Sequence, residues 1–135
     1  MRGGLRGIRE VLSVAGGLIV YVLGGYDSIL ELMLIAMSLD FLSGFLKAIY
    51  FDKRDNDKCY KGLARKSGML MLLGVITVID RQQVAGGMIR SWYIYAVTLN
   101  EAASCTENLG QMRVPLAKQV YDLIEKFKEK NNLKG

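Results

Sequence analysis

"LIAMSLDFLSGFLKAIYF", residues 34–51, is the most informative segment of the sequence. Extended back to Ile29, it is long and apolar enough to cross a bilayer, since a helix needs about 20 residues to span the hydrocarbon core. It nevertheless carries Asp40 near its middle and Lys47 near its end. An ionised aspartate at that depth costs about 2.5–3.5 kcal/mol. Asp40 must therefore be protonated, paired, or in contact with water inside a bundle.

The polar residues of this stretch lie on one face of the expected helix. Positions three or four apart share a helix face, and Asp40, Ser43, Gly44 and Lys47 have that spacing. The rest of the circumference is apolar. Lys47 can reach the headgroups with its long side chain, whereas Asp40 is too short and too deep to do so. The pattern predicts a transmembrane helix with a single face that lipid does not contact.

A second polar face occurs in "LNEAASCTENLGQ", residues 99–111. Glu101, Ser104 and Asn108 share one face, and Asn100 and Glu107 form a neighbouring line. So many polar groups have no good partner in lipid. They either bond to neighbouring helices only or line a water-filled path in an oligomer. The second alternative is favoured, because ionisable residues inside a membrane are functional by default.

Four segments are candidates for crossing a membrane: about residues 11–25, 29–51, 62–80 and 88–111. No uncharged run reaches 18 residues, and a buried helical bundle in water is the alternative. The cations argue against that alternative, because four crossings would place all but two of the 18 Lys and Arg residues on one side. By the positive-inside rule, both termini are cytoplasmic. The sequence thus predicts an all-α membrane protein with a transmembrane domain over residues 1–111.

The first candidate segment leaves the number of crossings at three or four. Its basic start and short apolar core also describe a signal peptide, but it lacks an A-x-A-like cleavage site. A helix lying in the plane of the interface is a third alternative. A crossing helix is favoured over a signal peptide.

Residues 112–135 are expected to form a cytoplasmic amphipathic helix followed by a basic tail. Pro115 suits the first position of a helix. Four apolar residues then make a stripe that should lie on the membrane or on a partner: Leu116, Val120, Leu123 and Phe127. Residues 52–66, with both signs of charge, are expected to be a solvated loop. Gly62 and Asp80 are expected at the boundaries of the third helix.

Composition excludes several classes of function. The net charge of +5 comes without a recognisable nucleic-acid module, so no nucleic-acid partner is expected. Histidine is absent, which removes the commonest general base and metal ligand. Cys59 and Cys105 have neither metal-site nor redox spacing and should be free. We expect no catalytic site, no metal and no cofactor.

Five runs together resemble the phage-lysis and toxin-secretion holin family: "MSLDFLSGFLKAIYFDKRD", "YKGLARKSGMLMLL", "VITVID", "NEAASCTENLGQM" and "VPLAKQVYDLIEK". The similarity covers about residues 35–127, in the family's order and spacing. The runs D-x-x-x-G-x-x-K-A and N-E-x-x-S-x-x-E-N-L are its most specific parts. Arg113 stands where the family often has glycine, and Ala117 lies near a second family proline, so the exit from the fourth helix is expected to be stiffer or differently angled here. The family's polar signature falls on Asp40, Gly44, Lys47, Gly62, Asp80, Asn100, Glu101, Ser104, Glu107, Asn108 and Pro115.

The resemblance implies a multi-pass protein of the bacterial host's inner membrane that self-associates and opens pores or lesions at a set time. The lesions would release an endolysin for host lysis or, in some systems, a large toxin. The expected partners are further copies of the chain, membrane lipid and the exported cargo. The alternative is a small homo-oligomeric ion channel or transporter, in which Asp40 and Glu101 would bind the ion.

Overall fold

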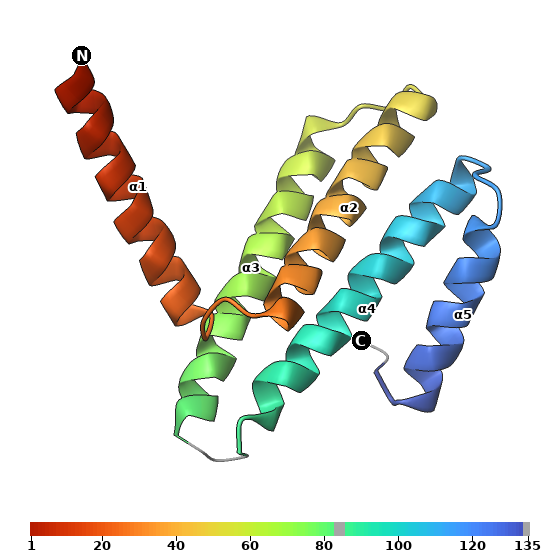
Figure 1. Ribbon diagram of the computed structural model, residues 1–135. Coiled ribbons are helices and arrows are strands. Elements are labelled where there is room, and N and C mark those ends of the chain that lie inside the picture. The colour runs from red at the N-terminus through yellow and green to blue at the C-terminus, as the bar shows by residue number, and fades with distance from the viewer. Residues whose placement is uncertain (83–85, 134–135) are drawn as a thin grey trace.

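The computed structural model describes residues 1–82 and 86–133, and within these ranges the protein consists of helices without a strand (Figure 1). The all-helical prediction is confirmed for this part of the chain. The five helices are α1 (Arg2–Val22), α2 (Ser28–Tyr50), α3 (Asn56–Arg81), α4 (Met88–Gln111) and α5 (Ala117–Lys130).

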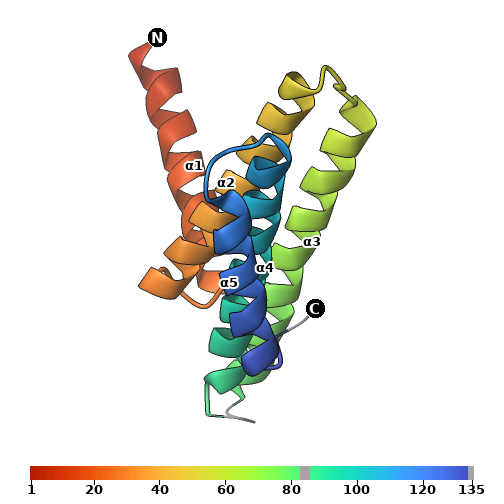
Figure 2. The same cartoon turned by 90° about the vertical axis from the view of Figure 1, so that its right-hand side faces the viewer.

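Helices α2, α3 and α4 form a bundle in which consecutive helices run antiparallel, as expected for helices joined by short connections, so that α2 and α4 run parallel (Figures 1 and 2). Helix α2 packs along α4, and α3 lies against both. The turn between α2 and α3 lies at the same end of the bundle as the turn between α4 and α5. The apolar core is centred on the fully buried side chains of Leu30, Met33, Leu73 and Ile94.

Two aspartates determine where helices begin. The carboxylate of Asp27 accepts a hydrogen bond from the Leu30 backbone N–H at 3.0 Å at the start of α2. The Asp55 carboxylate accepts from the Asp57 N–H at 2.9 Å and caps α3 in the same way. Because α3 begins at Asn56, Gly62 lies inside the helix. The predictions of a helix boundary at Gly62 and of a solvated loop over residues 52–66 are therefore wrong, since most of that segment is helical.

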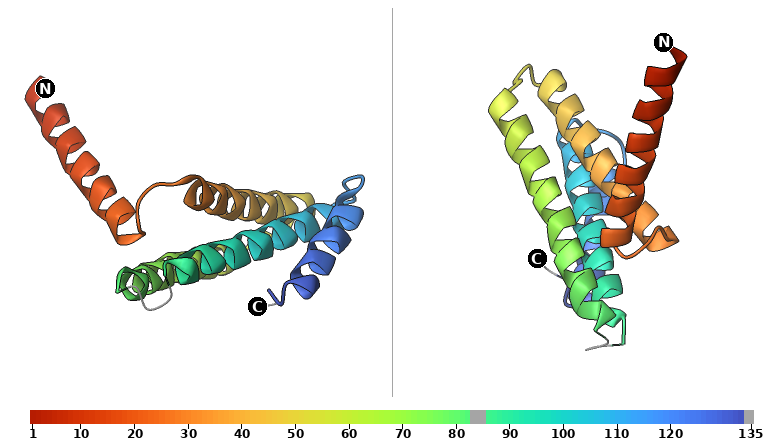
Figure 3. Two further views of the ribbon diagram at one scale, coloured as in Figure 1. Left: turned by 60° about the horizontal axis from the view of Figure 1, so that its bottom comes forward. Right: turned by 90° about the vertical axis from the view of Figure 1, so that its left-hand side faces the viewer.

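Helix α1 diverges from the bundle (Figure 3, left). None of its residues is buried, and among the helices it contacts only α3. At that contact, the Arg81 guanidinium lies 4.1 Å from the centre of the Tyr21 ring. The helix begins at Arg2, earlier than the segment 11–25 predicted from hydropathy, and ends before Gly24 and Gly25, whose φ angles are both +94°.

Helices α2 and α3 are long and apolar enough to cross a membrane, and no other helix in the described ranges meets the same criteria of length and composition. Only 33% and 22% of their most apolar windows are buried. The core helix of a water-soluble protein would be mostly buried, so this exposure favours lipid as the surrounding medium.

Helix α5 folds back beside α4 (Figure 2). It begins at Ala117, which is buried close to Gly110 of α4. Pro115 lies in the turn before the helix, so the prediction that it is the first helical residue is wrong. Leu116 adopts a left-handed backbone conformation in this turn, with a φ of +66°. The four residues of the expected apolar stripe are exposed: Leu116, Val120, Leu123 and Phe127.

Candidate functional site

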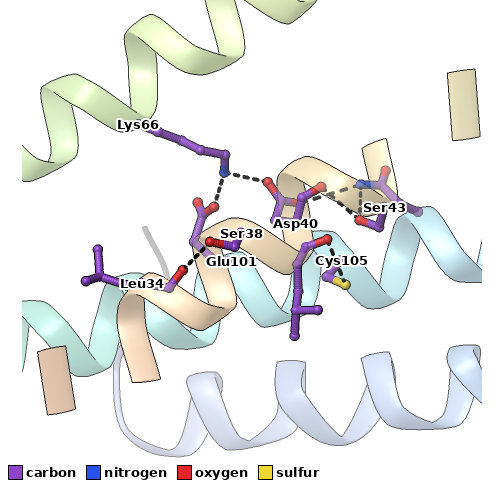
Figure 4. A network of polar contacts seen from close by, with 9 residues as sticks. Leu34, Ser38, Asp40, Ser43, Lys66, Glu101 and Cys105 are labelled. Carbon is purple, nitrogen blue, oxygen red and sulfur yellow. Dashed lines mark hydrogen bonds and ion pairs between the residues drawn. The ribbon is translucent and has the colours of Figure 1, made fainter. Parts of the chain in front are cut away.

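A buried cluster of three charges lies where α2, α3 and α4 meet (Figure 4). The Lys66 ammonium donates a hydrogen bond to Asp40 Oδ2 at 2.7 Å and a second one to the carboxylate of Glu101. The side chains of Lys66, Asp40 and Glu101 are only 10%, 8% and 3% exposed. Each helix of the bundle thus contributes one charged residue to a site from which water is nearly excluded.

The cluster is costly to bury and depends on all three helices. Removing ions from water carries a penalty of several kcal/mol each, which is offset only by close pairing and further hydrogen bonds. One ammonium between two carboxylates leaves one negative charge when all three groups are ionised. Any displacement of α3 would leave Asp40 and Glu101 buried together without their cation. The closed arrangement of the three helices is therefore coupled to this contact.

Asn108 of α4 extends the cluster toward the α2–α3 turn. Its amide nitrogen donates to Ser43 Oγ at 3.1 Å and to Asp40 Oδ1 at 3.5 Å. Its amide oxygen accepts from the Lys47 ammonium at 2.9 Å. The Ser43 hydroxyl also donates to the backbone carbonyl of Asp40 at 2.9 Å. A second cation, Lys47, is thereby connected to the Asp40 carboxylate through a single amide side chain.

The structure brings together most of the two predicted polar faces. Gly44 lies beside α4, where an added Cβ would be in ordinary van der Waals contact with the Asn108 amide nitrogen at 3.7 Å. Ser104 is half-buried and lines a cleft next to the cluster. Glu107 is exposed, and Asn100 makes no side-chain hydrogen bond to the residues that the structure describes. The faces predicted from helical spacing therefore meet each other within one chain, except at Asn100 and Glu107.

Lys66 is the site residue that sequence reasoning missed, because residues 52–66 were assigned to a loop. Two carboxylates at the depth of a membrane need protons, water or a cation, and a nearby lysine can supply the cation. Lys66 directly precedes the apolar run "SGMLMLL", residues 67–73, and becomes part of the crossing helix once α3 starts at its Asp55 cap. The aspartate cap was the signal that could have identified it.

Arg90 closes the opposite end of the bundle. Its guanidinium donates to the Leu23 carbonyl at 2.8 Å, to the Gly25 carbonyl at 3.2 Å and to Asp27 Oδ2 at 2.7 Å. The chain passes so close to it that a Cβ at Gly24 would overlap the Arg90 side chain. The hydrogen bond from Arg90 holds the pKa of Asp27 below its ordinary value. Arg90 thus joins the α1–α2 connection to α4.

Asp80, expected only to mark the end of α3, also caps α4. Its Oδ2 accepts a hydrogen bond from the Arg90 backbone N–H at 2.9 Å, in the first turn of α4. Gly87, at the N-cap position, has no side chain that could do this. The second carboxylate oxygen, Oδ1, is buried without a hydrogen-bond partner among the described residues. Asp80 therefore ties α3 to α4 at the end remote from Lys66.

Both cysteines are free, as expected from their spacing. Cys59 is exposed at the start of α3, and Cys105 is half-buried with its thiol 3.6 Å from the Leu39 carbonyl oxygen. Over residues 1–82 and 86–133, no group of three or more His, Cys, Asp or Glu side chains is arranged to hold a metal ion.

Two apolar helices with largely exposed surfaces, held together by buried ion pairs, define a small helical membrane protein. The chain belongs to the bacteriophage holin family, whose model matches residues 17–129. The match extends the similarity seen in the sequence, about residues 35–127, back into α1. Family membership implies oligomerisation and association with a membrane, and it points to a non-enzymatic membrane protein.

Individual relatives are similar over most of their length. A protein named probable holin from Bacillus phage phi105 is 27% identical over 105 residues, which is 78% of each chain. The uncharacterized protein YqxH of Bacillus subtilis is 30% identical over 118 residues, 84% of each chain. The uncharacterized protein CPE0383 of Clostridium perfringens is 27% identical over 120 residues, 88% of this chain and 89% of the relative. No solved structure matches the chain.

Proposed function

We propose that the protein is a holin that oligomerises in the bacterial cytoplasmic membrane and opens pores or lesions at a set time. The lesions release a phage endolysin that reaches the cell wall and lyses the host. The observation that carries the proposal is the cluster of Asp40, Lys66 and Glu101, which is buried in a bundle whose outer surface is apolar. Such a bundle can reside in lipid while it is closed. The polar side chains buried between its helices could line a water-filled pore once the helices separate.

The proposed topology has four crossings, with both termini in the cytoplasm and residues 1–111 as the transmembrane domain. In support, the end of the bundle with the α2–α3 turn carries most of the cations of the loops, and α1 runs so that its N-terminus points toward the same end (Figure 1). Among the loops and ends of helices α1–α4 in the described ranges, the opposite end has only Arg81 and Arg90. Lys128 and Lys130 in the last turn of α5 also lie toward this end while α5 is packed beside α4 (Figure 1). This sorting follows the positive-inside rule.

Helix α4 is too polar to cross lipid by itself and crosses as a member of the bundle. Its most costly group, the Glu101 carboxylate, is only 3% exposed because Lys66 and Asp40 cover it. Exposed charges on its partner α5, such as Lys118 and Asp122, would lie at the depth of hydrocarbon if α5 stayed beside α4. We infer that α5 swings onto the cytoplasmic surface about the turn before it, with its exposed apolar stripe on the membrane.

The proposed opening separates α3 from α2 and α4. Withdrawing Lys66 exposes Asp40 and Glu101 to each other, and neither can remain in a dry interior. In an assembly of several copies, these side chains would instead face a shared water-filled lumen. Collapse of the membrane potential can trigger the change, because moving one charge through 100 mV is worth about 2.3 kcal/mol. A few charges per assembly suffice to couple potential to opening.

The alternative of an ion channel or transporter has less support. In that alternative Asp40 and Glu101 would bind the ion, but Lys66 lies between them, at the position that a transported cation would occupy.

Timed induction in a bacterial host tests the proposal, with and without a cell-wall hydrolase that lacks its own export signal. We expect abrupt arrest of growth and loss of membrane potential in both cultures, and lysis only where the hydrolase is present. Continued growth with an intact membrane potential would overturn the proposal. Saturable ion uptake without loss of viability would support the channel alternative instead.

Variants link the timing to the cluster. Asp40→Asn and Glu101→Gln each weaken the attraction that holds Lys66, so both should change the trigger time. Glu107→Gln on α4 and Glu31→Gln on α2 are matched controls, because both residues are exposed. Equal trigger times in all four variants would show that the cluster does not control opening.

A further inference from the structure

A cleft of about 580 Å³ opens at the end of the bundle that carries the α2–α3 turn. Its walls come from α2, from the start of α3 and from α4, and its inner end reaches the buried cluster at Asp40 and Lys66. None of the polar contacts described above requires this space.

The cleft has a strong excess of positive charge, with six cations and two carboxylates in its lining. One of the carboxylates, Asp40, is already paired with Lys66. The other, Asp55, accepts backbone N–H groups at the start of α3. The cations are Lys47, Lys53, Arg54, Lys58, Arg65 and Lys66.

Four of these cations are available to a ligand. The side chains of Lys53, Arg54, Lys58 and Arg65 are exposed and form no ion pair or hydrogen bond with the residues that the structure describes. Lys and Arg side chains converging on one opening are suited to a phosphate group, which accepts several charge-assisted hydrogen bonds at once.

The other wall of the cleft is apolar and runs along α2. Phe41, Phe45, Ala48 and Phe51 have the spacing of one helix face, and all four line the cleft. Phe45 and Phe51 are 48% and 45% exposed. From Phe41 to Phe51 the helix rises about 15 Å, half the thickness of a hydrocarbon core. A soluble phosphate compound has no apolar part to bury against these phenylalanines, whereas the acyl chain of a lipid does.

We propose that this cleft binds an anionic phospholipid of the cytoplasmic leaflet, with its phosphate among the cations at the mouth and an acyl chain along the phenylalanine wall. The inference rests on the proposed topology, in which the α2–α3 turn faces the cytoplasm. The bound lipid lies against the three helices whose contact at Lys66 closes the bundle.

A fluorescent reporter at Cys59 tests the proposal on the full-length protein in detergent micelles. Cys59 is exposed and lines the cleft, and Cys105→Ser leaves it as the only thiol. The probes are phosphatidylglycerol, phosphatidylcholine with the same acyl chains, glycerol phosphate and inorganic phosphate. We expect a saturable response to phosphatidylglycerol at a mole fraction about 25-fold below that for phosphatidylcholine, because two or more cations contact the anionic head group at about fivefold for each. Equal responses to the two lipids, or an equal response to inorganic phosphate, would overturn the proposal.

Charge variants and a steric variant locate the lipid. Lys58→Gln with Arg65→Gln should weaken binding on the order of 25-fold, at about fivefold for each cation. Lys61→Gln with Lys118→Gln removes the same charge outside the cleft and should change binding less than threefold. Wild-type affinity in the Lys58 and Arg65 double variant would contradict the proposed site.

Gly62→Leu fills the cleft without changing its charge, and Gly68→Leu is its control on the same helix. Both glycines have open space around them, and only Gly62 lines the cleft. Binding should be lost in Gly62→Leu alone, with the helical content of both variants unchanged by circular dichroism. Unaltered binding in Gly62→Leu refutes the site. Lipid binding and growth arrest in the host are separate readouts. A negative lipid-binding result would overturn the lipid site and not the holin proposal, and absence of growth arrest would overturn the holin proposal and not the lipid site.

Discussion

Removing the cation from the buried cluster should destabilise the protein far more than removing the whole cluster. In Lys66→Met, Asp40 and Glu101 remain 8% and 3% exposed in the native packing and lose the ammonium between them. Breaking a buried ion pair by deleting one partner costs about 3–5 kcal/mol. The triple variant Lys66→Met, Asp40→Asn, Glu101→Gln has no charge left to desolvate. Its free energy of unfolding should return to within about 2 kcal/mol of the wild type.

The assay is reversible unfolding in mixed micelles with increasing denaturing detergent, followed by far-UV circular dichroism. Glu107→Gln serves as the control, because Glu107 is exposed on the same helix as Glu101 and should change the free energy by about 0.5 kcal/mol or less. The order of stability should be wild type, triple variant, then Lys66→Met.

Two results would contradict this account of the buried cluster. A loss below about 1 kcal/mol in Lys66→Met would mean that water or a neighbouring group replaces the ammonium, so the cluster is not isolated. A triple variant as unstable as Lys66→Met would mean that the lost packing of the lysine stem, and not the uncompensated carboxylates, causes the loss.

Three further predictions use the same unfolding assay. Gly24→Ala should lower the free energy of unfolding more than Gly25→Ala does. Both residues have a φ of +94°, but only at Gly24 would the added Cβ overlap the Arg90 side chain. Equal effects of the two substitutions would contradict this contact. The Asp27–Arg90 pair holds the pKa of Asp27 below its ordinary value of 3.8. Its stabilisation is therefore complete at neutral pH and is lost as the pH falls below about 4 toward the folded-state pKa, a loss that should be absent in Asp27→Asn. Gly62→Ala should stabilise α3 by up to about 1 kcal/mol, since the glycine lies inside the helix with open space around it, and destabilisation would show that the position needs glycine.

Helical spacing identified the polar faces because a helix imposes its period locally. Asp40, Ser43 and Lys47 share a face wherever the segment is helical, as do Glu101 and Asn108. The structure places these two faces against each other, linked by Asn108. The spacing could not show whether the opposing face comes from the same chain or from another copy, because contacts between chains in an oligomer would produce the same pattern of polar residues.

Hydropathy placed the start of α3 too late because charged residues lower the mean over any window. The capping hydrogen bonds of Asp55 start the helix at Asn56, which brings Lys66 into the bundle. Similarly, Asp80 was recognised only as the end of α3. Its second function, capping α4, depends on the position of Arg90 across the α3–α4 connection.

The helical character of the chain, the two polar helix faces and the need of Asp40 for a proton, a partner or water can all be predicted from the sequence. These properties follow from composition and from the period of a single helix. The packing of the helices in space reveals three further features: Lys66 is the partner of Asp40, Arg90 closes the other end of the bundle, and the apolar stripe of α5 is exposed. The register and rotation of one helix against another arise from the packing of many side chains at once, and no local pattern in the sequence specifies them.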